Sequence, residues 1–255
     1  MKEMTWTLAY FSPTGGTCKI ARAIAAGSGC RCVELDLTDP HFAVPQAGSD
    51  LLLTVVPVFG GRVPQICLQR LAMLQGKSKY AAAVVVYGNR AFDDALLELK
   101  DFLEQKGFLV IAAAAFVAEH SLVRTIAAGR PDESDRKIAE QFGKRIAGKW
   151  LKSEPQVILH VPGNNPYCEQ KPARFHPLAD ESCTRCGLCE ERCPTEAILR
   201  EDPCRLIENR CINCMRCVEV CPVHARRLPS AFVSGAKTML EEKAAIYRKP
   251  EIFLE

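Results

Sequence analysis

The chain has 255 residues, of which 48% are hydrophobic, and its formal net charge at pH 7 is +3. This length gives room for about two domains, and this composition is sufficient for packed cores. Positive and negative residues are interspersed rather than gathered in blocks, so the charge pattern gives no support for nucleic-acid binding. The first residues lack an apolar signal core and no apolar stretch reaches membrane-spanning length, so we expect a cytoplasmic protein with no membrane span.

Residues 1–150 alternate short apolar stretches with longer helical patterns, which predicts an α/β domain with a parallel sheet covered on both faces. The predicted strands span residues 5–11, 32–37, 51–56, 81–87 and 108–116. The predicted helices span residues 17–26, 64–74, 92–106 and 132–150. Asp132 is the expected N-cap of the last helix, and Gly107 is expected to end the third.

The segment between the first predicted strand and the first predicted helix has the composition of a phosphate site. It consists of Ser12, Pro13, Thr14, Gly15, Gly16 and Thr17. A doubly wound parallel sheet binds ligands beyond the carboxyl ends of its strands, where the following helix directs backbone N–H groups at an anion. Glycines let the backbone close around a phosphate, and hydroxyls add donors. The pattern is neither a Walker loop nor a dinucleotide fingerprint, and the alternative is a glycine-rich turn that only begins a helix.

The second half of the chain divides into three parts. Residues 151–177 are rich in proline and contain the turn signal Gly163-Asn164-Asn165, which predicts a linker. A cysteine-rich domain follows over residues 178–229. Residues 230–255 are expected to be a C-terminal tail in which residues 236–247 form one helix.

Eight of the fourteen cysteines form two copies of the pattern C-x-x-C-x-x-C-x-x-x-C-P. This is the pattern of bacterial ferredoxins, in which the fourth cysteine of each copy binds the cluster of the other copy. We therefore expect two 4Fe-4S clusters, one bound by Cys183, Cys186, Cys189 and Cys221, the other by Cys211, Cys214, Cys217 and Cys193. Zinc is the alternative, although zinc modules usually present paired C-x-x-C units. Such clusters favour a reducing, low-oxygen compartment.

The first loop resembles the phosphate loop of flavodoxins, and the whole chain resembles a family of fused flavodoxin and two-cluster ferredoxin proteins, the EFR-type ferrodoxins. The resemblance implies a flavodoxin-like, doubly wound, five-stranded parallel sheet of order 2-1-3-4-5, followed by a small α+β bacterial-type ferredoxin domain. It also implies FMN, with its phosphate in the first loop and its ring against two later loops. Those loops contain Pro57, Val58, Phe59, Gly60 and Gly61, and Tyr87, Gly88, Asn89 and Arg90.

Several single residues have two interpretations each. Phe59 is a candidate to stack on the flavin ring or an ordinary packed aromatic. Arg62 and Arg90 are candidates to place a cation near the flavin, or solvated loop arginines. His120, at the end of the fifth predicted strand, is a weak candidate catalytic residue, and a hydrogen-bonded loop histidine is the other interpretation. Cys18, at the start of the first helix, is expected to be a small packing residue.

Iron-sulfur clusters transfer single electrons, whereas FMN holds one or two. We therefore expect an electron-transfer protein that passes electrons between the clusters and FMN and has a redox partner protein as donor or acceptor. No acid, base or nucleophile arrangement identifies a catalytic residue. Two alternatives stay open: a flavin-dependent reductase of a small organic acceptor fed by the clusters, and a redox-sensing module.

Overall fold

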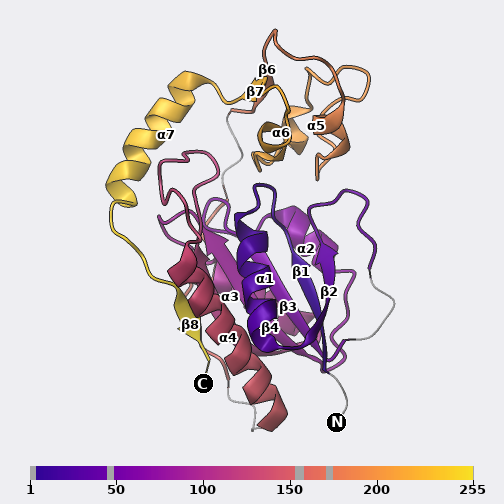
Figure 1. Ribbon diagram of the computed structural model, residues 1–255, viewed down its shortest axis with the longest axis vertical. Helices are drawn as coiled ribbons and strands as arrows, with labels where there is room; N and C mark the ends of the chain where they lie inside the picture. Colours follow the sequence, from indigo (N-terminus) through magenta and orange to yellow (C-terminus); the bar gives the residue numbers. More distant parts are fainter. Residues whose placement is uncertain (1–3, 45–48, 153–157, 171–174, 255) are drawn as a thin grey trace.

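The computed structural model describes residues 4–44, 49–152, 158–170 and 175–254, and places a small cysteine-rich unit above a larger α/β unit (Figure 1). A six-stranded sheet of order β2-β1-β3-β4-β5-β8 forms the centre of the α/β unit. Five of these strands are parallel: β1 (Thr5–Tyr10), β2 (Arg31–Asp36), β3 (Leu51–Pro57), β4 (Tyr80–Tyr87) and β5 (Leu109–Val117). The predicted order of the five parallel strands, 2-1-3-4-5, is confirmed.

The sixth strand is a difference from the sequence prediction. The segment expected to be a tail contains α7 (Ser230–Lys243) and then β8 (Glu251–Phe253), which pairs antiparallel with β5. The observed helix begins six residues and ends four residues before the predicted bounds of 236–247. Helix ends are the least certain part of a sequence prediction, and the weak apolar pattern of this segment adds to that uncertainty. The chain thus returns from the cysteine-rich unit to the edge of the sheet.

Two pairs of helices cover the two faces of the sheet. On one face, α1 (Gly16–Ser28) and α4 (Glu133–Lys152) bury apolar side chains such as Ile20 and Phe142. On the other, α2 (Gln65–Leu71) and α3 (Ala95–Gln105) bury side chains such as Leu71 and Leu99. The strands β3 and β4 are almost completely buried, as expected for the middle of a sheet that is covered on both faces.

The ends of two helices follow the sequence signals. The Asp135 N–H donates to Asp132 Oδ1 at 3.0 Å, so Asp132 caps α4 as predicted. Gly107 has a φ of +79° directly after α3, and its N–H donates to the Glu104 carbonyl at 2.9 Å. This confirms the predicted end of that helix. Helices α1 and α4 approach each other closely at Gly27. A Cβ at this position would lie only 1.9 Å from the Glu140 carbonyl oxygen, so only glycine fits there.

The two cysteine motifs of the cysteine-rich unit share the same pattern of backbone conformations. The strands β6 (Leu178–Ala179) and β7 (Arg226–Arg227) pair antiparallel and enclose α5 (Leu188–Glu191), the 3₁₀ turn Glu208–Arg210 and α6 (Arg216–Glu219). Left-handed backbone occurs at three matching places in the two cysteine motifs. These pairs are Arg185 and Asn213 (φ 57° and 52°), Gly187 and Met215 (78° and 62°), and Glu196 and His224 (50° and 52°). Nonglycine residues adopt this conformation rarely, so its repetition shows that both motifs form the same kind of loop.

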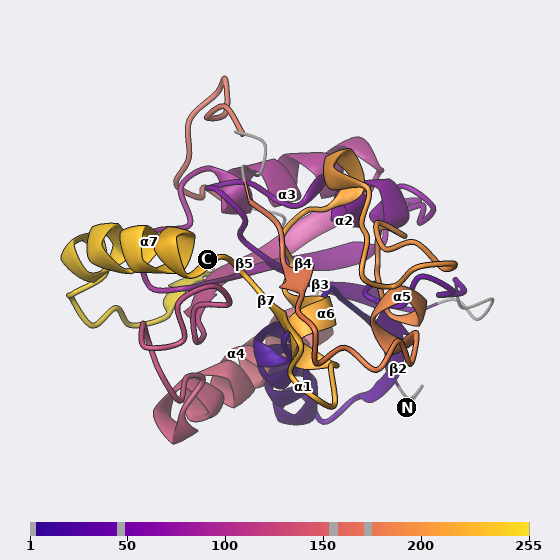
Figure 2. The ribbon, with the colours of Figure 1, turned by 90° about the horizontal axis from the view of Figure 1, so that it is seen from above.

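Viewed from above, the cysteine-rich unit lies over the end of the sheet, with α7 beside it (Figure 2). Among the described residues, no helix combines the length and the apolar character needed to cross a bilayer.

Candidate functional site

Arginine side chains join the two units at the carboxyl end of the sheet. Arg70 of α2 is 8% exposed, and its guanidinium donates to the Pro194 carbonyl at 2.7 Å, directly beside Cys193. The same guanidinium donates to the carbonyls of Leu37 and Asp39 in the loop after β2. A guanidinium presents five donors in a fixed planar arrangement, which suits bonds to several carbonyls at once. Arg70 therefore fixes the position of the cysteine loop on the α/β unit.

A second contact reaches the predicted phosphate loop. Arg216, at the start of α6, donates to the Pro13 carbonyl at 3.2 Å. Thr14, Gly16 and Thr17 line a narrow cavity, and Cys214 of the second cysteine motif lines the same cavity. The structure thus brings a predicted cluster ligand to the predicted phosphate loop, although the two are about 200 residues apart in sequence.

The phosphate loop has the properties of an anion site. Gly15, the N-cap residue of α1, has a φ of +87° and no side chain to cap the helix, and the first turn of α1 contains no acidic residue. Ser12 is buried, and its Oγ accepts from the Cys18 N–H at 2.8 Å, which closes the loop. The N–H groups at the start of this 13-residue helix and its dipole favour a negative group there. The loop therefore fits a phosphate group.

The loop after β3 forms a tight turn. The N–H of Phe59 donates to the Arg62 carbonyl at 2.9 Å, and the N–H of Arg62 donates to the Phe59 carbonyl at 3.2 Å. Between them, Gly60 and Gly61 have φ values of +61° and +85°, the positive pair that this kind of two-residue turn requires. The Phe59 side chain is half-buried and lines the narrow cavity next to the phosphate loop. It could stack there on the ring of a bound cofactor.

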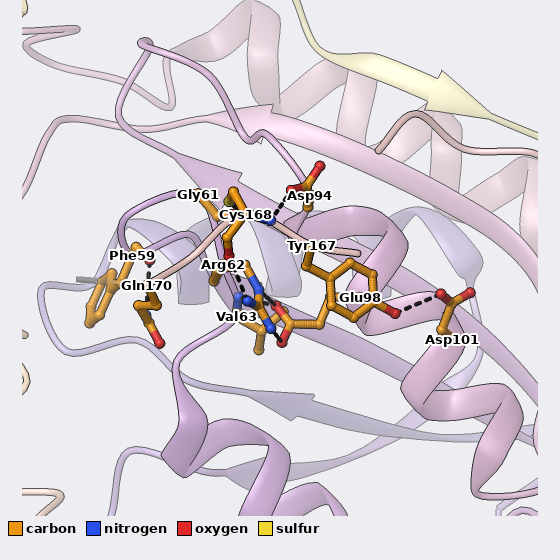
Figure 3. Close-up of polar contacts among 10 residues, drawn as sticks. All are labelled: Phe59, Gly61, Arg62, Val63, Asp94, Glu98, Asp101, Tyr167, Cys168 and Gln170. Carbon is orange, nitrogen blue, oxygen red and sulfur yellow. Dashed lines mark hydrogen bonds and ion pairs between the residues drawn. The ribbon is translucent and has the colours of Figure 1, made fainter. Parts of the chain in front are cut away.

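A polar network holds this turn in place (Figure 3). Arg62 donates to both carboxylate oxygens of Glu98 at 2.9 and 2.6 Å and to the Cys168 carbonyl at 2.7 Å. Glu98 also accepts from the Val63 N–H at 2.8 Å. Arg62 is therefore committed to an ion pair inside the fold, which differs from both sequence interpretations of this residue. A pairing between a loop and a helix 36 positions later leaves no local signal in the sequence.

The predicted linker segment is fastened to the same place. Asp94 accepts from the N–H groups of Asn164 and Cys168 at 2.8 and 2.6 Å. Burial alone would raise the pKa of Asp94, but these hydrogen bonds outweigh that effect and lower it. Gln170 adds a bond from its side-chain amide to the Phe59 carbonyl at 3.1 Å. Asn164, Cys168 and Gln170 thus fasten this segment beside the turn.

The loop after β4 has divided roles. The Asn89 side chain donates to the carbonyls of Ala244 and Ile246 at 2.7 and 3.0 Å and accepts from the Arg248 N–H at 3.3 Å. Asn89 therefore holds the C-terminal segment, and only its backbone remains for a cofactor. Arg90 forms an ion pair with Asp93. The Tyr87 ring packs on Phe92, and its hydroxyl has no hydrogen-bond partner among the described residues.

His120 is a hydrogen-bonded loop histidine that also lines the cavities. Its Nδ1 accepts from the N–H groups of Leu122 and Val123 at 3.2 and 3.3 Å, so the ring proton lies on Nε2. Burial, together with the charge of Arg90, lowers the pKa of His120, which favours the neutral ring. A Cβ on Gly88 would lie 2.4 Å from His120 Cδ2. Gly88 therefore allows the ring edge that carries Nε2 to lie against this loop.

Two larger cavities adjoin the narrow one. The first, of about 740 Å³, lies between the units and is lined by Phe59, His120, Gln170 and His176 and by residues 208–209 and 211–213. The second, of about 630 Å³, lies between the loops after β3 and β4 and the helix α7. Val58, Gly60, His120 and Leu122 line both. Val58 and His120 line the narrow cavity as well, so the three cavities adjoin, and each of the two larger ones has the size that a small organic ligand needs.

The second set of cysteines surrounds a common space. Cys193, Cys211, Cys214 and Cys217 line one apolar cavity, together with Arg226. This is the set predicted for one cluster. Burial raises the pKa of the Cys214 thiol and raises that of Cys217 to about 12. Such thiols become thiolates only when a metal displaces their protons, so the donor set fits an iron-sulfur cluster.

The first set of cysteines is more exposed. Cys186 is exposed, whereas Cys189 is buried and its Sγ accepts from the Nε of Arg226 at 3.3 Å. The fourth cysteines of the two motifs have equivalent bonds: Cys193 accepts from the Ala197 N–H, and Cys221 from the Ala225 N–H, each at 3.3 Å. Hydrogen bonds to sulfur of this kind tune cluster potentials. Sequence reasoning identified the cysteines but missed Arg70 and Arg226, for which no motif exists.

Three of the cysteines outside the motifs are packing residues. Cys18, Cys30 and Cys32 pack against the core beside α1 and α4, and burial raises the pKa of each. Cys18 is therefore not activated by the helix dipole, in agreement with its expected packing role.

Strand order and loop positions define a flavodoxin-like α/β domain, and the cysteine-rich unit is a 4Fe-4S domain, so the chain is a redox protein of the electron-transfer class. Residues 179–199 and 205–227 match the family of 4Fe-4S binding domains. Comparison with curated proteins gives no match.

Among solved structures, the chain is similar to a flavodoxin from the domain Archaea, with 15% identity, 57% of this chain and 98% of that chain covered, and a TM-score of 0.44. A Streptococcus pneumonia TIGR4 flavodoxin has 18% identity, 57% and 99% coverage, and a TM-score of 0.43. Rubredoxin:oxygen oxidoreductase from Desulfovibrio gigas has 15% identity, 58% and 36% coverage, and a TM-score of 0.45. These structural similarities cover only part of the chain. The flavodoxin-like class is therefore assigned from the strand order.

Proposed function

We propose that this chain is a cytoplasmic electron-transfer protein in which two 4Fe-4S clusters exchange electrons with FMN. One observation carries the proposal: Cys214, a candidate cluster ligand, lines the same cavity as Thr14 and Thr17 of the phosphate loop. Two redox centres in contact with one cavity are close enough for direct transfer. The buried contacts of Arg70 and the bond of Arg216 keep that spacing constant.

The residues divide between the cofactors as follows. In this proposal, residues 1–150 hold FMN, residues 151–177 connect the domains, residues 178–229 hold the clusters, and residues 230–255 follow them. The residues for FMN are Ser12, Pro13, Thr14, Gly15, Gly16 and Thr17 for the phosphate, and Pro57, Val58, Phe59, Gly60, Gly61, Tyr87, Gly88, Asn89 and Arg90 for the ring. One cluster takes Cys183, Cys186, Cys189 and Cys221, the other Cys193, Cys211, Cys214 and Cys217.

The exposure of the cysteines indicates which proposed cluster faces a partner protein and which faces the flavin. Cys186 lies at the surface, so a redox partner protein meets the first cluster. Cys214 is buried against the α/β unit, so the second cluster faces FMN. FMN, when bound, supplies a centre that takes up one or two electrons. The protein then couples a one-electron partner to a two-electron one.

Anaerobic purification with iron, sulfide, zinc and flavin analysis tests the cofactor content. We expect about eight irons and one FMN per chain, as two cubanes and one flavin require. Zinc in place of iron would overturn the proposal.

The route is tested with the Cys214→Ser variant. Flavin reduction is followed by stopped-flow absorbance after mixing with a reduced ferredoxin. We expect the variant to keep FMN but to reduce it at least tenfold more slowly, because one cluster has lost a ligand. The matched control is Cys32→Ser, a half-buried cysteine outside the motifs, which should behave like the wild type. Equal rates in all three proteins, with the iron content of Cys214→Ser lowered, would contradict the route.

A further inference from the structure

We propose that the cavity beneath α7 binds a flat, mostly apolar carbonyl compound of the quinone class, which takes electrons from the flavin. This inference rests on the proposed function and adds to it the place where electrons leave the protein and the kind of molecule that receives them.

The cavity has a wall on each side. Residues of the two candidate flavin loops form one wall, among them Val58, Gly61 and Gly88. Residues of α7 form the other wall: Ala231, Phe232, Gly235, Ala236, Met239 and Leu240. The volume of about 630 Å³ falls in the range of pockets that hold a small organic molecule. A molecule bound here therefore touches both the flavin loops and the helix.

The cavity is mostly apolar, and its surface is only partly covered. Phe175 and Phe232 both line it, and their ring centroids lie 4.8 Å apart. Phe175 is 44% exposed and Met239 is 47% exposed. Of the residues of α7, only Leu240 is fully buried, so the helix leaves room beneath it. Apolar surface that stays open beside a redox site indicates a binding surface for an apolar ligand.

The polar groups of the cavity lie at the flavin end and include hydrogen-bond donors. Arg90 and His120 line it, and none of its lining residues within the described part of the chain is acidic. The neutral His120 ring carries its proton on Nε2, because Nδ1 already accepts from its own loop, whereas Arg90 is paired with Asp93. A carbonyl oxygen matches these donors, whereas a cation finds no partner. The cavity thus favours a neutral or anionic compound with acceptor oxygens.

The position of the cavity separates electron entry from electron exit. The cavity of about 740 Å³ is lined by Cys211, Ile212 and Asn213 of the cluster domain, and the cavity beneath α7 is not. The two meet at Val58, Gly60, His120 and Leu122. Each is large enough for one ligand, so a flavin alone does not fill both. A flavin at this junction receives electrons on the cluster side and is open to an acceptor on the α7 side.

The reaction balances with one further reactant, a low-potential one-electron donor protein at the clusters. Two donor proteins each lose one electron, and the quinone gains these two electrons and two protons from solvent. Its two C=O bonds become C–OH bonds, and it leaves as the hydroquinone. In this proposal, the Nε2–H of His120 is the donor within the chain to the carbonyl oxygen during this change.

Binding is tested on the oxidised protein with its cofactors, without turnover. Isothermal titration calorimetry measures the Kd for menadione, a naphthoquinone, and parallel analyses measure FMN and iron. Ala236→Phe fills the cavity from α7. Gly235→Leu does so at a position where an added Cβ meets no atom within 4 Å, so this second variant keeps the fold. The matched control is Ser234→Phe, which adds the same ring at an exposed α7 position outside the cavity lining.

We expect the wild type and Ser234→Phe to bind menadione equally, and both cavity variants to bind it at least tenfold more weakly with unchanged FMN and iron. Equal Kd values in all four proteins, or no saturable binding to a wild type that holds FMN and iron, would overturn the inference. Loss of FMN in both cavity variants alone would assign this cavity to the flavin and overturn the inference, leaving the proposed function intact. A wild type without FMN would overturn both.

Discussion

In the proposed arrangement of two clusters, Arg226 is placed to influence their reduction potentials. It is 2% exposed, its Nε donates to Cys189 Sγ at 3.3 Å, and it donates to the carbonyls of Pro177 and Pro203. It also lines the cavity of the second cysteine set. A single buried guanidinium therefore lies between the two sets of ligands. Replacing it with glutamine removes a positive charge that favours each reduced cluster.

The size of the effect follows from Coulomb's law. The electron added to a cluster lies a few ångström beyond Cys189 Sγ, so we take a separation of about 6 Å and an effective dielectric constant of about 20, which gives about 3 kcal/mol. For a one-electron couple this corresponds to roughly 120 mV, since about 59 mV is a tenfold change in equilibrium constant. We expect Arg226→Gln to lower at least one cluster potential by about half this amount or more, because water and neighbouring groups screen part of the charge.

The assay is an anaerobic redox titration followed by electron paramagnetic resonance, with iron analysis of each protein. Arg226→Lys is the matched control: it keeps the charge and loses the planar arrangement of donors, so its potentials should stay closer to the wild type. Potentials of Arg226→Gln within about 20 mV of the wild type, in a protein with full iron content, would refute the electrostatic reasoning.

Three other changes test neighbouring parts of the structure. Thr14→Asp places a carboxylate beside the phosphate and should weaken FMN binding by about tenfold or more beyond the effect of Thr14→Val, which only removes the hydroxyl donor, as measured by flavin fluorescence titration of the apoprotein. Asn89→Ala removes three hydrogen bonds to the C-terminal segment and should cost about 2–3 kcal/mol locally, seen as faster hydrogen exchange at Ile252; unchanged exchange would contradict this role. The lowered pKa of Asp94 means that its stabilisation is complete above about pH 4–5 and is lost as pH falls through the folded-state pKa. Asp94→Asn should flatten this acid dependence of the urea midpoint, and parallel curves would contradict the assignment.

The sequence was most informative where local patterns carry the structure. The apolar stretches predicted five parallel strands, and Asp132 and Gly107 marked the helix ends, because caps and strand patterns depend on neighbours within a few residues. The β8 strand was missed because three residues, Glu251–Phe253, are too short to show a period of two. Its pairing with β5 is a contact across most of the chain.

For the candidate site, sequence spacing predicts the ligands but not the residues that support them. Glycine and cysteine spacings identify the loops because those spacings reflect local backbone needs. The bond of Arg70 to Pro194 spans 124 positions, and that of Asn89 to Ile246 spans 157. Such partners share no spacing rule, so only the folded chain shows that Asn89 holds the C-terminal segment and that Cys214 meets the phosphate loop.

The short strand β8 also protects the protein from self-association. Residues 111–115 of β5 are apolar and fully or almost fully buried, and β5 would otherwise be the last strand of the sheet, with unpaired N–H and C=O groups. An open apolar edge of this kind is a template for pairing with another chain. Residues Glu251–Phe253 cover part of it, at Ala113, Ala114 and Ala115. Removal of the last few residues should therefore affect solubility and monomer content before it affects any cofactor, so changes near this end need a check for aggregation.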